Sequence, residues 1–173
     1  MADFNLAFRK TMNLEGGLVL HEVEGDAGGL TFAGISQNNW PNWLGWDILK
    51  EDNNTITPKL IVHVQDFYRK HFWNVIGGDQ IKSQRIASAI YDLGVNAGAR
   101  VAVKLAQTLA HLSVIDGITG PITISALNNV NENMFLSQYV LERIKYYESI
   151  CSKKESQRKF FFGWVRRALQ FAP

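Results

Sequence analysis

Apolar residues in this chain recur mostly at helical spacing, three or four positions apart, in segments separated by glycine, proline and capping residues. This spacing predicts helices over about residues 2–14, 57–73, 83–96, 100–112, 132–150 and 155–171. A short helix is expected to open at Gly120-Pro121, and another to run from Ser36 toward Pro41. The pattern is typical of a mainly helical protein.

One stretch near the N-terminus departs from this spacing. Between Leu18 and Ala33 the apolar period shortens toward two, and Gly25, Gly28 and Gly29 supply turn conformations that other residues adopt at a cost. We therefore expect two or three short strands there, in an α+β, mainly α fold with a small N-terminal β-hairpin or sheet. No internal repeat or linker divides the chain, so a single domain over residues 1–173 is expected.

The composition is that of a globular protein, with 46% apolar and 20% charged residues in 173. Cys151 is the only cysteine, which excludes an internal disulfide and a multi-thiolate metal site. The four histidines lack ligand spacing, so neither a metal nor a cofactor is expected. No apolar run approaches the roughly 20 residues of a membrane span, and the first ten residues are too polar for a cleavable signal. We expect synthesis in the cytoplasm without a signal peptide.

Basic residues gather toward the C-terminus. Although the net charge is only +2, residues 141–173 contain eight Lys or Arg and three Glu. Such an end can meet an anionic polymer such as cell wall, nucleic acid or lipid headgroups, or it can be a solvated helix face. DNA binding through the short helices near Gly120 and this basic end is a further alternative, but we expect no nucleic-acid partner.

Two carboxylates flank the expected strands. Glu15 lies on the last turn of the first helix, where the helix dipole disfavours an anion, as suits a proton donor. Asp26 lies on the glycine-rich turn. Two carboxyl groups about 6.5–9.5 Å apart can hydrolyse a glycosidic bond with inversion, one donating a proton and the other activating water. Thr31 can orient that water, although acidic residues in turns also occur without any catalytic role.

The motifs together resemble those of one enzyme family. Glu15-Gly16-Gly17 and the run from Asp26 to Ile35 resemble the EGG and D-x-GG-x-T-x-x-GI signature of the family 108 glycoside hydrolases, which are N-acetylmuramidases. Further matches along nearly the whole chain are Tyr91-Asp92, Val95-Asn96-x-Gly98, Leu105-x-Gln107, Asp116-Gly117-x-x-Gly120-Pro121-x-Thr123 and Gly163-Trp164-x-x-Arg167.

This resemblance implies a lysozyme-like fold, with a catalytic part over residues 1–98 and a helical, peptidoglycan-binding-like part over residues 99–173. It implies cleavage of the β-1,4 bond between N-acetylmuramic acid and N-acetylglucosamine, with peptidoglycan glycan strands as the partner. Glu15 matches the catalytic acid of the family. Asp26 and Thr31 resemble the Glu, Asp, Thr order of phage-type lysozymes, at intervals that differ by a residue or two. We expect a monomer that reaches the wall by holin-type release.

Substrate-binding candidates follow from side-chain chemistry. Four tryptophans can stack on sugar faces: Trp40 and Trp43, which are the main candidates, Trp46 close by, and Trp73 further along the chain. Indole side chains also pack in protein cores. Asp92 and Asn96 lie one helical turn apart and can form hydrogen bonds along a groove floor, or else satisfy a helix end.

Other functions fit the same residues. A single-acid lytic transglycosylase would release a 1,6-anhydro product, and a non-catalytic wall-binding or secretion-associated protein would keep the fold without activity. The segment from Asp116 to Thr123 can contact wall peptide or glycan, or can simply form a tight turn that caps a helix.

Overall fold

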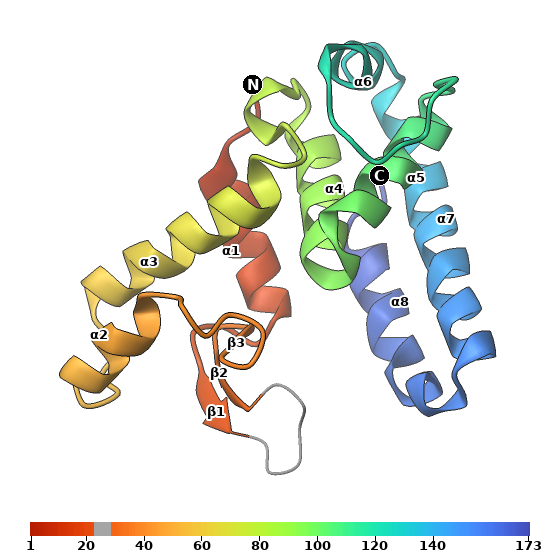
Figure 1. Cartoon of the computed structure of the whole chain (residues 1–173). Helices are drawn as coiled ribbons and strands as arrows, with labels where there is room; N and C mark the ends of the chain where they lie inside the picture. Colours follow the sequence, from red (N-terminus) through yellow and green to blue (C-terminus); the bar gives the residue numbers. More distant parts are fainter. Residues whose placement is uncertain (23–28) are drawn as a thin grey trace. The chain divides into compact units, whose positions relative to one another are not determined.

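The computed structural model describes residues 1–22 and 29–173, which are mainly helical (Figure 1). The elements in chain order are α1 (Phe4–Leu14), β1 (Leu20–Glu22), β2 (Leu30–Phe32), β3 (Ile35–Ser36), α2 (Gly45–Glu51), α3 (Pro58–Tyr68), the π-helix η1 (Arg69–Trp73), the 3₁₀ helix η2 (Gly78–Gln80), α4 (Gln84–Ala97), α5 (Ala99–Leu109), α6 (Pro121–Leu127), α7 (Glu132–Lys153), the 3₁₀ helix η3 (Glu155–Phe160) and α8 (Phe161–Leu169). One small sheet among helices confirms the expected α+β, mainly α class. Among these helices, none has the length and apolar character needed to cross a bilayer.

The chain forms two compact units. We call residues 8–70 the N-terminal unit, and residues 1–7 together with 71–173 the C-terminal unit. The compact units divide at residue 70, and α4 packs against α5 across residue 98. A single domain over residues 1–173, with a catalytic part over residues 1–98 and a peptidoglycan-binding-like part over residues 99–173, stays a prediction.

The sheet of the N-terminal unit is antiparallel, with strand order β1-β2-β3. Leu20 pairs with Phe32, and Phe32 pairs with Ile35 across a two-residue turn. Because paired residues share a face and neighbours along a strand alternate, these three side chains lie on one face, where Phe32 and Ile35 are buried. Thr31 and Ser36 pair on the opposite face, away from this core.

Aromatic side chains fill the core of the N-terminal unit. The ring of Trp43 stacks on Phe32, with 6.3 Å between ring centroids. It also meets Trp46 and Phe67 edge to face at 5.0 and 6.3 Å. Trp46 is buried and donates its indole N–H to the carbonyl oxygen of Trp40 at 2.8 Å. Each aromatic pair adds about 0.5–1.5 kcal/mol beyond burial, so the cluster binds the sheet firmly to α2 and α3.

Local capping signals set the starts of three helices. Asp3, Thr57 and Ser83 each accept a hydrogen bond from a backbone N–H in the first turn of the helix that follows. Pro58 occupies the first position of α3, where its missing N–H costs no intrahelical bond. The helices expected to begin at these residues are therefore confirmed.

Two expected helices need correction. Ser36 is paired in β3 and residues 37–39 form turns, so the helix expected from Ser36 toward Pro41 is wrong. The Ser36 hydroxyl accepts a hydrogen bond from the Asn39 N–H at 3.3 Å, a capping contact that here closes a turn. The helix expected over residues 155–171 is divided into η3 and α8.

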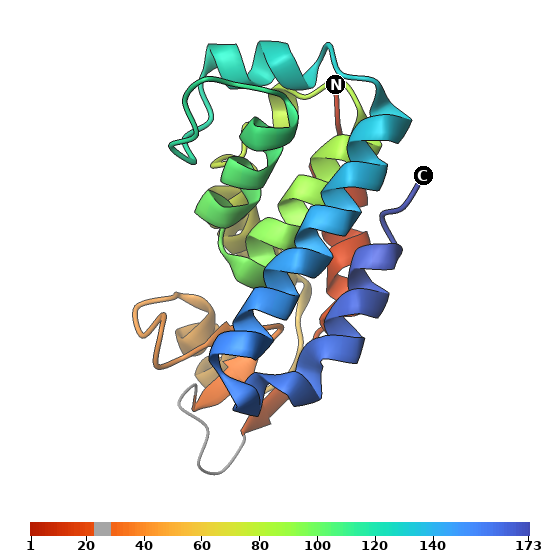
Figure 2. The ribbon, with the colours of Figure 1, turned by 90° about the vertical axis from the view of Figure 1, so that its right-hand side faces the viewer.

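Helix α4 is central to the C-terminal unit. Residues 86–94 of this helix are all buried. It packs against α5 and α7, and α7 packs against α8 as a helical hairpin (Figure 2). A helix enclosed in this way is apolar on most sides, and its few polar residues have to be paired inside the core.

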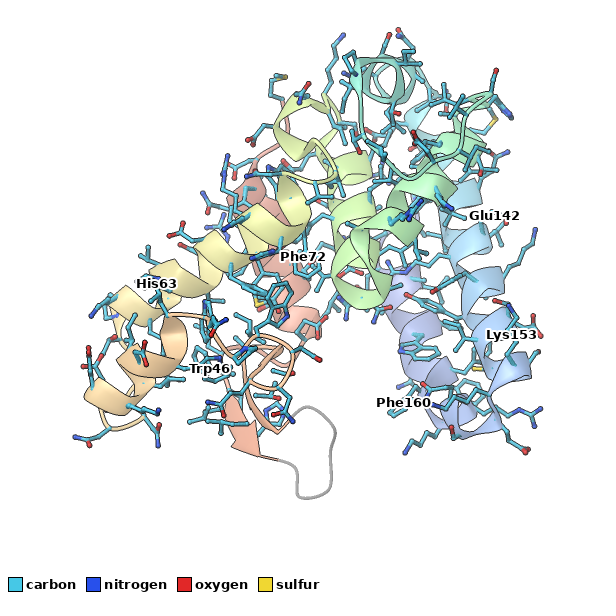
Figure 3. All side chains as sticks on the ribbon, viewed as in Figure 1. Trp46, His63, Phe72, Glu142, Lys153 and Phe160 are labelled. Carbon is cyan, nitrogen blue, oxygen red and sulfur yellow. The ribbon has the colours of Figure 1, made fainter. Side chains whose placement is uncertain are left out.

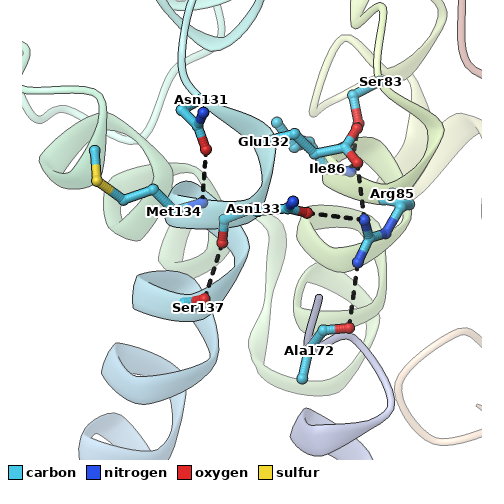
Figure 4. A network of polar contacts seen from close by, with 9 residues as sticks. All are labelled: Ser83, Arg85, Ile86, Asn131, Glu132, Asn133, Met134, Ser137 and Ala172. Carbon is cyan, nitrogen blue, oxygen red and sulfur yellow. Dashed lines mark hydrogen bonds and ion pairs between the residues drawn. The ribbon is translucent and has the colours of Figure 1, made fainter.

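Polar side chains join the starts of α4 and α7 (Figure 4). The Ser83 hydroxyl donates to Glu132 at 2.5 Å, and Arg85 donates to Glu132 at 3.0 Å. Arg85 also donates to Asn133 at 3.1 Å and to the carbonyl oxygen of Ala172 at 3.4 Å. The last residues of the chain are thereby tied to the first turn of α4.

Candidate active site

Glu15 directly follows α1. Its backbone N–H donates to the carbonyl oxygen of Thr11 at 3.0 Å, and the N–H of Gly17 donates to that of Met12 at 2.9 Å. Gly16 and Gly17 have φ angles of 88° and 85°, which only glycine adopts without steric cost. The glycine pair therefore ends the helix sharply and leaves the Glu15 side chain half-exposed.

The turn between β2 and β3 lies beside the Glu15 carboxyl group. A Cβ atom placed on Gly34 would be 3.8 Å from Oε2 of Glu15 and 2.8 Å from the Tyr68 hydroxyl. Tyr68 donates a hydrogen bond to the carbonyl oxygen of Ala33 at 2.7 Å, and the Ala33 N–H donates to that of Val19 at 3.1 Å. Ala33 and Gly34 have φ angles of 49° and 78°, as the central residues of a type I′ turn do. Tyr68 thus fixes the turn that faces Glu15.

Of the other two expected catalytic residues, Thr31 and Asp26, the structure describes only Thr31. Thr31 is half-exposed, lies on the sheet face opposite Phe32, and donates its hydroxyl to the carbonyl oxygen of Gly29 at 3.2 Å. Asp26 lies outside the described residues. Their catalytic roles stay predictions.

The tryptophans divide into core and surface residues. Trp46 and Trp73 are buried, and Trp73 donates its indole N–H to Asp79 at 2.8 Å, so both are core residues. Trp43 is half-buried in the aromatic core. Trp40 is 38% exposed and meets Phe67 edge to face, with 4.8 Å between centroids. Of the four, Trp40 has the most surface to offer a sugar.

The structure corrects the expectation that Asp92 lines a groove, since this side chain is completely buried in the C-terminal unit. Its carboxylate accepts hydrogen bonds from Arg143 at 2.7 Å and from Arg167 at 2.8 Å. Two guanidinium groups compensate the buried charge, which would otherwise be strongly destabilising. Asp92 therefore holds α4 to α7 and α8, and this contact explains the arginine of the Gly163-Trp164-x-x-Arg167 motif.

Asn96, one turn beyond Asp92, is half-exposed. Its amide oxygen accepts a hydrogen bond from the Tyr147 hydroxyl at 2.6 Å, and that hydroxyl accepts one from Arg143 at 2.6 Å. Burial raises the pKa of Tyr147, against an opposing effect of the Arg143 charge. The phenol therefore stays protonated and holds the orientation of the Asn96 amide, whose contact with substrate stays a prediction.

Gln107 organises the segment from Asp116 to Thr123. Its amide N–H₂ group donates to Asp116 at 2.9 Å and to the Thr123 hydroxyl at 3.3 Å. Its amide oxygen accepts the N–H of Gly117 at 2.9 Å. The hydrogen bond from Gln107, followed by that from the Ile118 N–H, lowers the pKa of Asp116 below its ordinary value. Two separate sequence motifs thereby form one structural unit, which precedes and begins α6.

A surface pocket of about 490 Å³ lies in this segment. Exposed apolar side chains line much of it, including Val114, Ile118 and Ile122. His111, Ser113 and Asp116 contribute polar groups. The pocket is thus amphipathic, and it lies entirely within the C-terminal unit.

Sequence reasoning did not identify Tyr68 or the spatial role of Gly34. Gly34 belongs to the family signature, so its motif was a usable signal. No sequence pattern pointed to Tyr68, because its hydrogen bond to Ala33 joins residues 35 positions apart.

Comparisons with known proteins agree with this architecture. The solved structure of Brucella abortus SagA is 24% identical over 98% of this chain and 95% of that chain, with a TM-score of 0.67, so the two share a fold. Twelve solved chains match in all, whereas no curated protein does. A family model described as a predicted peptidoglycan domain matches residues 101–169. The model for glycosyl hydrolase 108 matches residues 8–98, more than half of the chain. The chain therefore belongs to the glycosyl hydrolase 108 family, and it is a glycoside hydrolase that degrades peptidoglycan.

Proposed function

We propose that this enzyme is an N-acetylmuramidase that cleaves the β-1,4 bond between N-acetylmuramic acid and N-acetylglucosamine, with Glu15 as general acid. The observation that carries the proposal is the place of Glu15, whose half-exposed carboxyl group follows a rigid helix and faces a glycine turn. This residue and this turn both belong to the segment that the glycosyl hydrolase model matches.

The turn places a glycine, and so no side chain, beside the carboxyl group. Because Gly34 has no side chain, the volume beginning 3.8 Å from Oε2 of Glu15 remains free of a Cβ atom. A general acid has to come within hydrogen-bonding distance of the oxygen that it protonates. A glycine at this position therefore suits the approach of a glycosidic oxygen.

The reaction that we propose is hydrolysis with inversion. Glu15 gives its proton to the leaving oxygen as the glycosidic bond breaks, and water forms the new bond to the anomeric carbon. Asp26 takes the proton of this water or stabilises the positive charge that develops on the sugar. The Thr31 hydroxyl, on the sheet face away from the core, helps to orient the water.

Trp40 is the residue we propose for sugar stacking, since its indole is partly exposed while its backbone is held by the bond from Trp46. An aromatic face covers the apolar C–H surface of a sugar ring, whereas its N–H can meet a hydroxyl group. Trp43 would contribute only an edge, because the aromatic core holds most of its surface.

The pocket around Ile118 and Ile122 is our candidate for contact with the peptide stems of peptidoglycan. It lies in the segment that matches the predicted peptidoglycan domain. Its apolar lining suits short alkyl side chains, and its polar groups suit peptide amides. Action as a monomer, and release to the wall by a holin without a signal peptide, stay predictions.

Substitution of the proposed acid tests this function. Glu15→Gln keeps the shape of the side chain but removes the proton that it can donate, so we expect loss of turbidity clearing while purified sacculi still pellet the protein. Glu51→Gln is the matched control, because Glu51 is an exposed carboxylate of the same unit that pairs only loosely with Lys59, at 3.7 Å. Full clearing by Glu15→Gln, or a wild-type protein that binds sacculi but never clears them, would contradict the proposal.

A further inference from the structure

The end of the α7–α8 hairpin presents aromatic and basic side chains together. We call residues 153–166 the hairpin tip. Phe160 and Phe162 are 45% and 77% exposed. The tip carries one carboxylate, Glu155, and five exposed cationic side chains: Lys153, Lys154, Arg158, Lys159 and Arg166. Figure 3 labels Lys153 and Phe160 at this end of the hairpin.

Aromatic contacts connect the hairpin tip to the core of the C-terminal unit. Phe160 stacks on Trp164 with 5.8 Å between ring centroids, and Trp164 lies 5.1 Å from the ring of Tyr147. Tyr147 is buried and hydrogen-bonded to Arg143. The ammonium group of Lys159 lies 4.9 Å from the centre of the Phe160 ring. This arrangement holds a cation over the face of a phenyl ring at the surface.

Exposed phenylalanine among cations is the chemistry of an interfacial membrane anchor. Phenyl rings gain free energy at the boundary between headgroups and acyl chains, while Lys and Arg meet lipid phosphates. A wall polymer or nucleic acid would use the cations and can stack a sugar or a base on a ring face, but it offers no apolar layer that would bury a side chain as exposed as Phe162. The aromatic residues therefore favour a lipid surface over other anionic partners.

We propose that the hairpin tip docks the enzyme on the surface of anionic lipid bilayers, with Phe160 and Phe162 inserted at the headgroup boundary. The excess of four positive charges in the tip complements the negative charge of such a surface. The contact is peripheral, and it does not depend on which bond the enzyme cleaves.

Co-sedimentation of the full chain with vesicles tests this proposal. We expect binding to vesicles of phosphatidylcholine and phosphatidylglycerol, weaker binding in high salt, and little binding to phosphatidylcholine alone. Phe162→Ser should weaken binding about tenfold, because the ring no longer enters the lipid boundary. Its matched control is Leu141→Ser, which removes an apolar side chain that is 58% exposed on the same hairpin.

The charges are tested by a second pair of variants. Lys153→Gln should weaken binding about fivefold, the contribution of one cation near an anionic surface. Lys145→Gln makes the same change on α7 about 12 Å away along the helix axis, beyond the ~8 Å Debye length, so its effect should be smaller.

Three results would overturn the proposal. The first is equal binding to neutral and anionic vesicles, or none to either. The second is an unchanged affinity of both Phe162→Ser and Phe160→Ser for anionic vesicles. The third is binding to polyglycerol phosphate or duplex DNA that matches vesicle binding and ignores the phenylalanines, which would mark the tip as a general polyanion site. Unchanged thermal midpoints verify that the variants fold.

Discussion

The contact between Gly34 and Tyr68 supports the geometry of the proposed acid, and a substitution can measure it. Gly34→Ala places an L-residue at a φ of 78°, in the left-handed region, which costs roughly 1–2 kcal/mol. The added Cβ atom would also lie 2.8 Å from the Tyr68 hydroxyl, which has to move. Movement weakens its hydrogen bond to Ala33, a net loss of about 1 kcal/mol. We expect a total destabilisation of about 2–3 kcal/mol.

Gly17→Ala separates strain from contact. Gly17 has a φ of 85°, but a Cβ atom there would meet nothing within 4 Å. Gly17→Ala should therefore lower the free energy of unfolding only through backbone strain, by about 1 kcal/mol less than Gly34→Ala does. Tyr68→Phe removes the hydroxyl and leaves the buried Ala33 carbonyl without this bond, at a cost of about 1–3 kcal/mol. Gly34→Ala added to Tyr68→Phe should then cost only the strain, so the two changes are less than additive by about 1 kcal/mol.

Urea unfolding followed by circular dichroism measures these free energies, and clearing of cell-wall suspensions measures activity. Gly34→Ala should also reduce activity, since its methyl group enters the space 3.8 Å from the Glu15 carboxyl oxygen. Strictly additive costs of the Gly34 and Tyr68 changes, or equal costs at Gly34 and Gly17, would refute the reasoning.

Three more predictions concern other parts of the chain. Asp92→Asn should lower the free energy of unfolding in urea by about 3–5 kcal/mol, because two guanidinium groups lose their buried counter-charge. The control is Glu142→Gln, which removes a surface ion pair with Lys145, and an equally small effect of both substitutions would contradict this prediction. Gln107→Leu should raise the pKa of Asp116 toward 3.8 in an NMR titration, and an unchanged value would refute the cause given above. Because the folded-state pKa is lowered, the stabilisation from ionised Asp116 is complete above pH 3.8 and is lost as the pH falls through the lowered value. Trp40→Ala should weaken the binding of glycan fragments about threefold to tenfold, measured by fluorescence titration. Trp40→Phe should keep most of the affinity, because a phenyl ring can still stack on a sugar. An equal loss of affinity in both variants would exclude stacking.

Much of the helical framework could be predicted because its signals are local. The caps at Asp3, Thr57 and Ser83 bond to N–H groups only two or three residues away, so the sequence itself contains the whole interaction. The glycine pair after Glu15 is a signal of the same kind. Such signals predicted where α1 ends and therefore where the proposed acid lies.

The predictions fail where strand pairing or contacts with distant residues override a local preference. Ser36 has the capping chemistry of a helix start, but its pairing with Thr31 in the sheet overrides that preference. Asp92 and Asn96 share a helix face, yet Arg143 and Arg167, more than fifty positions along the chain, bury one of them. Periodicity shows which residues share a face but not what covers that face.

Digestion of purified sacculi in heavy-oxygen water, with mass analysis of the released fragments, tests the central claim most directly. A muramidase with Glu15 as its acid should release fragments that end in reducing N-acetylmuramic acid carrying one heavy oxygen, and Glu15→Gln should release none. Fragments that end in 1,6-anhydro-N-acetylmuramic acid, or reducing ends on N-acetylglucosamine, would contradict it.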